Sequence, residues 1–129
     1  MGELTIGAVN RITVTVNEKM LAANVGSGTL RVLATPAVAA LMEQAACELV
    51  QPYLGEGITT VGTMIKIDHL SATPEGAQVT AEARLVDMLD RKFTFELTAS
   101  DNAGIIAKGS HERFTVKSAR FMEKTNAKL

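Results

Sequence analysis

One long helical pattern, in a chain whose other patterns are those of strands, constrains the fold most. It begins at Thr35-Pro36, where we expect Thr35 to be the N-cap and the proline to occupy the first helical position. Pro52 and Gly55 predict its end. Apolar residues at helical spacing form its stripe: Val38, Leu41, Met42, Ala45, Ala46 and Leu49. A single helix cannot bury such a stripe alone, so the strands must cover it.

The other patterns predict one strand before the helix and four after it. Their ranges are about 6–16, 58–70, 77–88, 92–100 and 105–117. Turn formers separate them, with a loop over 24–28 and a tail over 118–129 that is either a short helix or frayed. This element order predicts an α+β fold, with a five-stranded antiparallel sheet wrapped around one long central helix. The length of the chain predicts one domain over residues 1–129.

Composition and charge exclude several classes of protein. A formal net charge of −1 lacks the basic footprint of a nucleic-acid-binding protein. Cys47 is the one cysteine and there are two histidines, so we expect no disulfide and no metal site. The chain begins without a secretory pattern and has no apolar run of bilayer length. We therefore expect a soluble cytoplasmic protein with no membrane partner.

Glu43 is the most informative residue of the helix. It belongs neither to the apolar stripe nor to the polar face that carries Gln44 and Glu48. Its helical neighbours on this flank are small: Ala39, Ala40, Ala46 and Cys47. One interpretation is an exposed acid at the edge of the stripe. The other is a partly desolvated carboxylate that acts as a general base or a nucleophile, with room beside it for another molecule.

Three other positions have both a structural and a functional interpretation. His69 ends a row of alternate residues that begins at Val61 and that we expect to face inward, where a lone histidine is usually structural. Gly62 interrupts a β-branched strand and predicts a bulge or a close approach by a ligand. Thr35 lies where free N–H groups at a helix start can stabilise an oxyanion.

The run Gly109-Ser110-His111-Glu112-Arg113 lies late in the last predicted strand. As a structural feature it is a solvated strand end. As a functional feature it helps to hold a phosphorylated cofactor or forms an ion pair between subunits.

Taken in order, these segments resemble the fluoroacetyl-CoA thioesterase-like branch of the hot-dog-fold acyl-CoA thioesterases. The resemblance covers roughly residues 30–128. The segments that carry it are TPAVAALMEQAAC at 35–47, QPYL at 51–54, VGT at 61–63, His69, ATPEG at 72–76, GSHER at 109–113 and KTNAK at 124–128.

The resemblance implies a hot-dog fold and hydrolysis of a small acyl-CoA to the free acid and CoA. It implies Thr35, Glu43 and His69 as the catalytic residues, with Glu43 as base or nucleophile and the other two assisting. We expect Gly62, which helps to polarise the thioester carbonyl, and Arg113 to bind the substrate. The family also implies a homodimer or a dimer of dimers with sites at the subunit interface, where two chains can contribute to one constellation. No bound cofactor is expected, because CoA enters as part of the substrate.

The first 30 residues depart from the family pattern, since the first aromatic residue of the chain is Tyr53. Members selective for a fluorinated acyl group resemble one another in having aromatic residues before the helix, so fluoroacetyl specificity is not predicted. One alternative is a non-catalytic acyl-CoA-binding or sensing protein on the same fold. Another is a hot-dog hydratase or dehydratase, which would carry a histidine five residues after the acid, where Glu48 stands.

Overall fold

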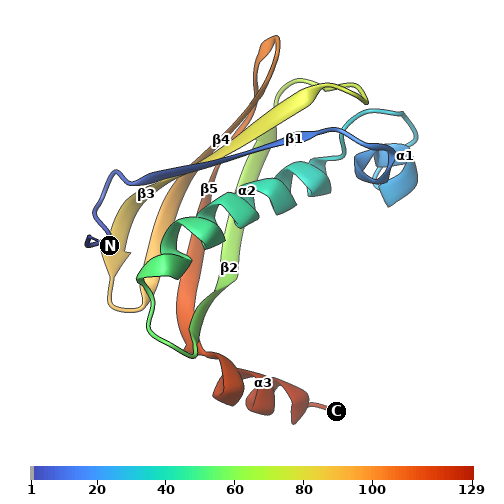
Figure 1. Ribbon diagram of the computed structural model, residues 1–129. Helices are drawn as coiled ribbons and strands as arrows, with labels where there is room; N and C mark the ends of the chain where they lie inside the picture. Colours follow the sequence, from blue (N-terminus) through green and yellow to red (C-terminus); the bar gives the residue numbers. More distant parts are fainter. Residues whose placement is uncertain (1) are drawn as a thin grey trace.

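The computed structural model describes residues 2–129 and contains one antiparallel sheet and one long helix (Figure 1). The sheet has the strand order β1-β3-β4-β5-β2. Its strands are β1 Val9–Thr15, β2 Ile58–His69, β3 Gln78–Leu89, β4 Lys92–Asp101 and β5 Gly104–Lys117. The long helix α2, Thr35–Val50, runs along the concave face of the curved sheet. The predicted fold class, a helix wrapped by a five-stranded antiparallel sheet, is confirmed.

The segment between β1 and α2 contains short helices that the sequence patterns did not reveal. The 3-10 helix η1, Glu18–Met20, and helix α1, Ala22–Val25, lie between β1 and α2. Each is too short to show a helical period. Another 3-10 turn, η2 Gln51–Tyr53, follows α2. The tail forms helix α3, Ser118–Asn126, which agrees with the first of the two predictions for it. β1 begins later than predicted, because a turn that contains Gly7 at a φ of 95° precedes it.

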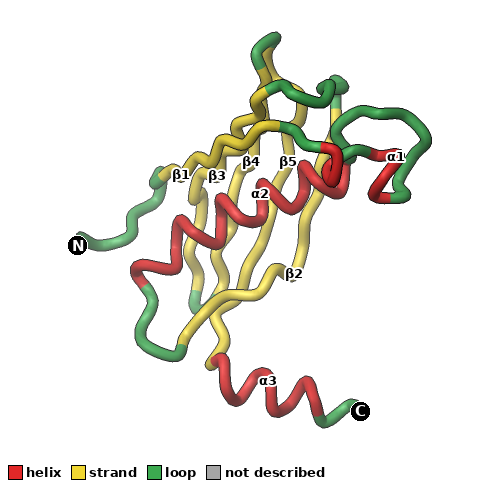
Figure 2. Tube along the Cα trace, turned by 45° about the vertical axis from the view of Figure 1, so that its right-hand side comes forward, coloured by secondary structure: helices red, strands yellow, loops and turns green. Residues whose placement is uncertain are grey.

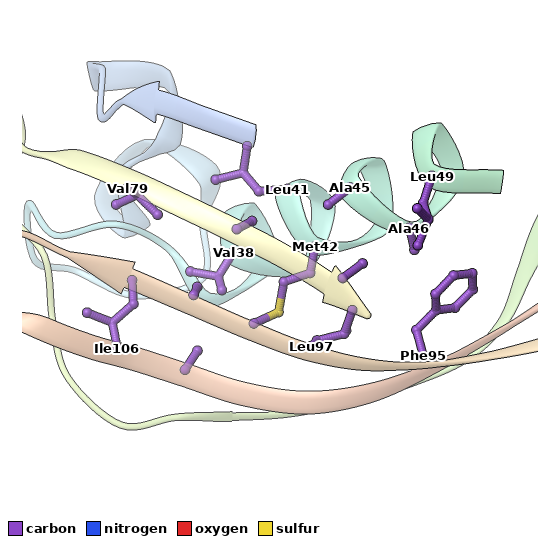
Figure 3. Packing of buried hydrophobic residues seen from close by; sticks show 14 of the residues in the cluster. Val38, Leu41, Met42, Ala45, Ala46, Leu49, Val79, Phe95, Leu97 and Ile106 are labelled. Carbon is purple, nitrogen blue, oxygen red and sulfur yellow. The ribbon is translucent and has the colours of Figure 1, made fainter. Parts of the chain in front are cut away.

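The core lies between α2 and the concave face of the sheet (Figure 3). All six residues of the predicted stripe are buried, together with Val50. Alternate residues of β3 and β4 pack against this stripe from the sheet: Val79, Ala81, Ala83, Leu85, Phe95, Leu97 and Ala99. Many of these side chains are alanine, which lets the helix pack close to the strands. This packing fixes which flank of α2 looks toward β2 and β5.

The start of α2 differs from the prediction by one residue. Ala34 is the N-cap, and its carbonyl accepts from the N–H groups of Ala37 and Val38. Thr35 is the first helical residue, so the prediction that it caps the helix was wrong. Its hydroxyl is engaged elsewhere, with His69. The first N–H groups of a helix can also bond to water or to backbone carbonyls, so α2 does not need a side-chain cap.

A bulge in β2 corrects the predicted faces of that strand. Gly62 pairs with Arg113 and Met64 pairs with Glu112, so Thr63 is an extra residue. The extra residue reverses the alternation, and Val61 therefore does not share a face with His69. In a regular strand, Gly62 and His69 would lie on opposite faces, because they are seven residues apart. With the bulge between them, both face α2. The bulge that Gly62 predicted is confirmed.

β2 is one of the two edges of the sheet, as the tube in Figure 2 shows. Its residues 62–66 are exposed, including Met64 at 39% and Ile65 at 38%. An edge strand presents unpaired N–H and C=O groups, and these apolar side chains lie beside them. Within residues 2–129, none of the helices has the length and apolar character needed to cross a membrane.

Candidate active site

Thr35 and His69 form a pair at the start of α2. The Thr35 hydroxyl and His69 Nδ1 lie 2.7 Å apart, and either atom can donate the hydrogen bond. α2 supplies the threonine at its first residue and β2 supplies the histidine at its last. His69 Nε2 is buried and has no hydrogen-bond partner among residues 2–129. An unpaired buried ring nitrogen is unusual and often marks a functional site.

A cavity of about 260 Å³ adjoins this pair. It is lined by Ala22, Ser27, residues 32–35 and residues 69–72. The first turn of α2 has few N–H groups to offer there, because Pro36 has none and those of Ala37 and Val38 donate to Ala34. The turn can therefore present the N–H of Thr35, next to the hydroxyl of the same residue. These two donors are suited to a carbonyl oxygen that gains negative charge.

The Glu43 carboxylate lies more than two turns further along α2, over Gly62 of β2. Its side chain is 41% exposed, which fits the predicted position between the apolar and polar faces. A Cβ atom at Gly62 would lie 2.7 Å from Glu43 Oε2. The glycine thus provides the space that the carboxylate occupies.

A buried arginine stands behind this carboxylate. Arg113 Nε donates to Thr60 Oγ1 at 2.8 Å and Arg113 Nη2 donates to the Thr60 carbonyl at 3.0 Å. Arg113 Nη1 lies 3.8 Å from Glu43 Oε2, which is longer than a hydrogen bond. The carboxylate therefore has a cation beside it but no direct hydrogen bond from that cation. It remains free to accept a proton or to attack a carbon atom.

His111 completes the support of Arg113. His111 Nδ1 lies 2.7 Å from the Met64 carbonyl, which can only accept, so Nδ1 carries the proton. Nε2 is then the acceptor for Arg113 Nη1 at 3.2 Å. Burial lowers the pKa of His111 below its ordinary value of 6.5, and the Arg113 charge acts in the same direction. A neutral His111, 4.0 Å from Glu43 Oε2, forms no ion pair with it.

The structure thus joins the predicted site residues in two separate groups. We call Thr35 and His69 the helix-start pair, and Glu43, Gly62, His111, Arg113 and Thr60 the carboxylate group. The interpretation of residues 109–113 as a solvated strand end was wrong for His111 and Arg113, which are 0% and 7% exposed. Both side chains lie on the face of β5 that α2 covers, next to Glu43.

No sequence pattern predicted a role for Thr60, and His111 was noted only as part of the run 109–113. The spacing of His111 and Arg113, two residues apart, places both on one face of a strand. That spacing was the available signal for His111. Thr60 had none, because its partner lies 53 residues away.

A long helix wrapped by an antiparallel sheet of five strands is the architecture of the hot-dog class of proteins. The profile of the fluoroacetyl-CoA-specific thioesterase family matches residues 16–119. The chain is 37% identical over 98 residues to the fluoroacetyl-CoA thioesterase of Streptantibioticus cattleyicolor, covering 76% of this chain and 68% of that one.

Solved structures agree with these sequence matches. A structure of the fluoroacetyl-CoA thioesterase FlK superposes with a TM-score of 0.94 at 27% identity and covers 99% of each chain. A thioesterase superfamily member from Thermus thermophilus shares the fold, with a TM-score of 0.90 at 22% identity over 98% of this chain and 94% of that one. The chain belongs to the fluoroacetyl-CoA-specific thioesterase family and is an acyl-CoA thioesterase.

Proposed function

We propose that this enzyme hydrolyses a small acyl-CoA with Glu43 as the catalytic carboxylate and with Thr35 and His69 assisting. One observation carries the proposal. The Glu43 carboxylate is half-exposed over a glycine, with the buried Arg113 guanidinium 3.8 Å away and held back from it by Thr60. A carboxylate placed in this way has no direct hydrogen bond from the neighbouring cation and keeps its oxygen atoms free for chemistry.

The two groups of site residues are too far apart to act on one thioester within a single chain. Thr35 and Glu43 are eight residues apart, which is about 12 Å along a helix. Their partners on β2, His69 and Gly62, are about 20 Å apart along a strand. One thioester group cannot span either distance. We therefore propose that the helix-start pair of one chain meets the carboxylate group of another.

The edge strand β2 supports a homodimer of this kind. Its outer hydrogen-bonding groups are unpaired in the sheet, and Met64 and Ile65 are exposed apolar side chains on it. A twofold axis beside β2 would bring two copies together so that each contributes both groups. Such an interface contains two equivalent sites. A dimer of dimers would repeat the same unit.

In the proposed reaction the thioester carbonyl oxygen lies at the start of α2, where the Thr35 N–H and hydroxyl stabilise its developing charge. Glu43 takes a proton from a water molecule, and the water oxygen bonds to the carbonyl carbon. The carbon–sulfur bond then breaks, and the CoA thiolate takes a proton from His69 or from water. Alternatively, Glu43 itself attacks the carbonyl carbon, and water hydrolyses the resulting anhydride. Neither route uses a cofactor other than the CoA of the substrate.

We propose that Gly62 and Arg113 bind the acyl end of the substrate. Nη1 of Arg113 has two N–H groups. One donates to His111 Nε2, and the other can face the space between Gly62 and Glu43. That space is narrow, which favours a short acyl group. The residues before α2 contain no aromatic side chain, so this proposal does not extend to selectivity for fluoroacetyl-CoA.

Hydrolysis of a panel of acyl-CoA thioesters tests the assignment of Glu43. The panel should include acetyl, fluoroacetyl, branched and aromatic acyl groups, with release of free thiol as the readout. We expect kcat of Glu43→Gln to fall about 10³-fold on the preferred substrate, while the melting temperature stays near that of the wild type. Glu48→Gln, an exposed acid on the same helix, is the matched control. Wild-type turnover by folded Glu43→Gln and Glu43→Ala would contradict the proposal.

A further inference from the structure

A strongly basic hollow of the surface lies outside the site described above, at helix α3. A cavity of about 440 Å³ is lined by Arg91, Val116, Lys117, Arg120, Phe121 and Lys124. We propose that it binds the 3′-phosphorylated ADP end of coenzyme A. This inference rests on the proposed function, since it names the place where the distal end of the same substrate is held.

Four cations meet at this hollow. The turn between β3 and β4 brings in Arg91, whose carbonyl accepts from the Thr115 N–H of β5. Arg120 and Lys124 are four residues apart on one face of α3, and Lys117 is the N-cap residue of this helix. The whole chain has 13 basic and 14 acidic residues, so the two kinds are nearly balanced. The lining of this hollow has four basic residues and no acidic one, which is a local excess of positive charge.

None of the four cations forms an ion pair within residues 2–129. The ion pairs that the structure shows use other lysines and arginines: Arg11, Arg31, Lys66, Lys92 and Arg113. The nearest acids in the sequence, Asp90 and Glu123, do not line the hollow. Four unpaired cations repel one another, and an anion bound among them relieves that repulsion.

The hollow also contains an apolar surface of the kind that a nucleobase needs. The Phe121 ring is 37% exposed, and Val116 is half-buried beside it. A purine can stack on an exposed aromatic ring while its phosphates contact lysine and arginine. Bound phosphate alone would make no use of the ring. The diphosphate and 3′-phosphate of CoA carry about four negative charges, which matches the four cations.

The distance to the catalytic region suits the arm that joins the two ends of CoA. Arg113 of the carboxylate group and Lys117 of the hollow are four residues apart on β5, or about 13 Å. The pantetheine arm, comparable with a short extended peptide, spans roughly 15 Å. A substrate can therefore place its thioester near Glu43 and its nucleotide at α3.

The first experiment compares substrates with and without the nucleotide. S-acyl-N-acetylcysteamine carries the same thioester as acyl-CoA but lacks the nucleotide. In Arg120→Ala/Lys124→Ala, the ratio of kcat/KM for acyl-CoA to that for the truncated thioester should fall at least about tenfold. Arg84→Ala/Lys108→Ala removes the same charge from exposed positions elsewhere and should keep the wild-type ratio. An unchanged ratio in the α3 variant would overturn the proposal, as would an equal loss in the control.

The second experiment does not depend on catalysis. Calorimetry with adenosine 3′,5′-bisphosphate should show binding to the wild type that weakens in the α3 double variant and at higher salt. Phe121→Leu should weaken binding of this nucleotide but leave binding of inorganic tripolyphosphate unchanged. Helix α3 has no buried residue, so these variants should fold. If no acyl-CoA is hydrolysed but the nucleotide binds at α3, the proposed function fails and this inference stands. If the nucleotide does not bind, the inference fails.

Discussion

The helix-start pair and the carboxylate group both lie along α2, but they are held in different ways. The helix-start pair is a single hydrogen bond between the exposed Thr35 and the half-buried His69. The carboxylate group is supported by buried side chains that bond to one another and to the β2 backbone at the bulge. Changes in the first group should therefore alter catalysis alone, whereas changes behind Glu43 should also alter stability.

The largest effect is expected at Arg113. Arg113→Met removes a buried cation and leaves Thr60 and His111 without their partner, which should lower the free energy of unfolding by about 3–5 kcal/mol. Urea unfolding followed by circular dichroism measures it. Lys92→Met, which loses only a partly exposed ion pair with Glu112, should change stability far less. Equal effects of the two substitutions would show that the support of Arg113 is not structural.

A smaller effect on stability is expected at Gly62. The added methyl group of Gly62→Ala would lie 2.7 Å from Glu43 Oε2 and push the flexible carboxylate aside, and it would also lie 3.1 Å from His111 Cε1 and 3.3 Å from Arg113 Nη1. We expect kcat to fall about 100-fold, with a loss of stability smaller than that of Arg113→Met. Gly109→Ala is the contrasting variant, because its methyl group would collide with the Lys66 backbone carbonyl and should destabilise the fold. A stability loss at Gly62 as large as that at Gly109 would refute this distinction.

Thr35→Val tests the helix-start pair. It keeps the shape of the side chain but removes the hydroxyl that meets His69, so we expect kcat/KM to fall about tenfold. The free energy of unfolding should stay within about 0.5 kcal/mol of the wild type, because Thr35 is exposed. Thr35→Ser keeps the hydroxyl and should remain close to the wild type. A marked loss of stability in Thr35→Val would mean that the pair is structural.

The smallest effect concerns pH and His111. Because burial lowers the pKa of this imidazole below 6.5 in the folded state, the unfolded chain takes up the proton first as the pH falls. The stability that neutral His111 contributes is complete above pH 6.5 and is lost as the pH falls from there toward the folded pKa. Urea unfolding between pH 7.5 and 5.5 should show a weaker pH dependence in His111→Asn than in the wild type. His69→Gln controls for the other histidine, and identical slopes in His111→Asn and the wild type would contradict the assignment.

The sequence predicted the elements well because their signals are local. The apolar period of α2 and the turn residues between strands depend on neighbours in the chain, and the structure confirms them. The short helices η1 and α1 were missed because three or four residues cannot show a helical period. The faces of β2 were wrong because one extra residue, Thr63, reverses the alternation.

The candidate site was predicted less completely than the fold. The identities of Thr35, Glu43 and His69 came from the family resemblance, but the sequence did not show that they fall into two groups. Helical spacing shows the flank of α2 on which Glu43 lies, not the strand that it faces. The burial of Arg113 also depends on contacts with Thr60, far away in the sequence.

A mixture of two inactive variants tests the proposed two-chain site most directly. Thr35→Val/His69→Ala and Glu43→Gln are purified separately, unfolded, mixed in equal amounts and refolded together. If each site takes its helix-start pair from one chain and Glu43 from another, mixed dimers contain one intact site. Random reassortment should then restore about a quarter of the wild-type activity. No recovery, in a mixture shown to contain mixed dimers, would place all three residues of each site in one chain and contradict the account.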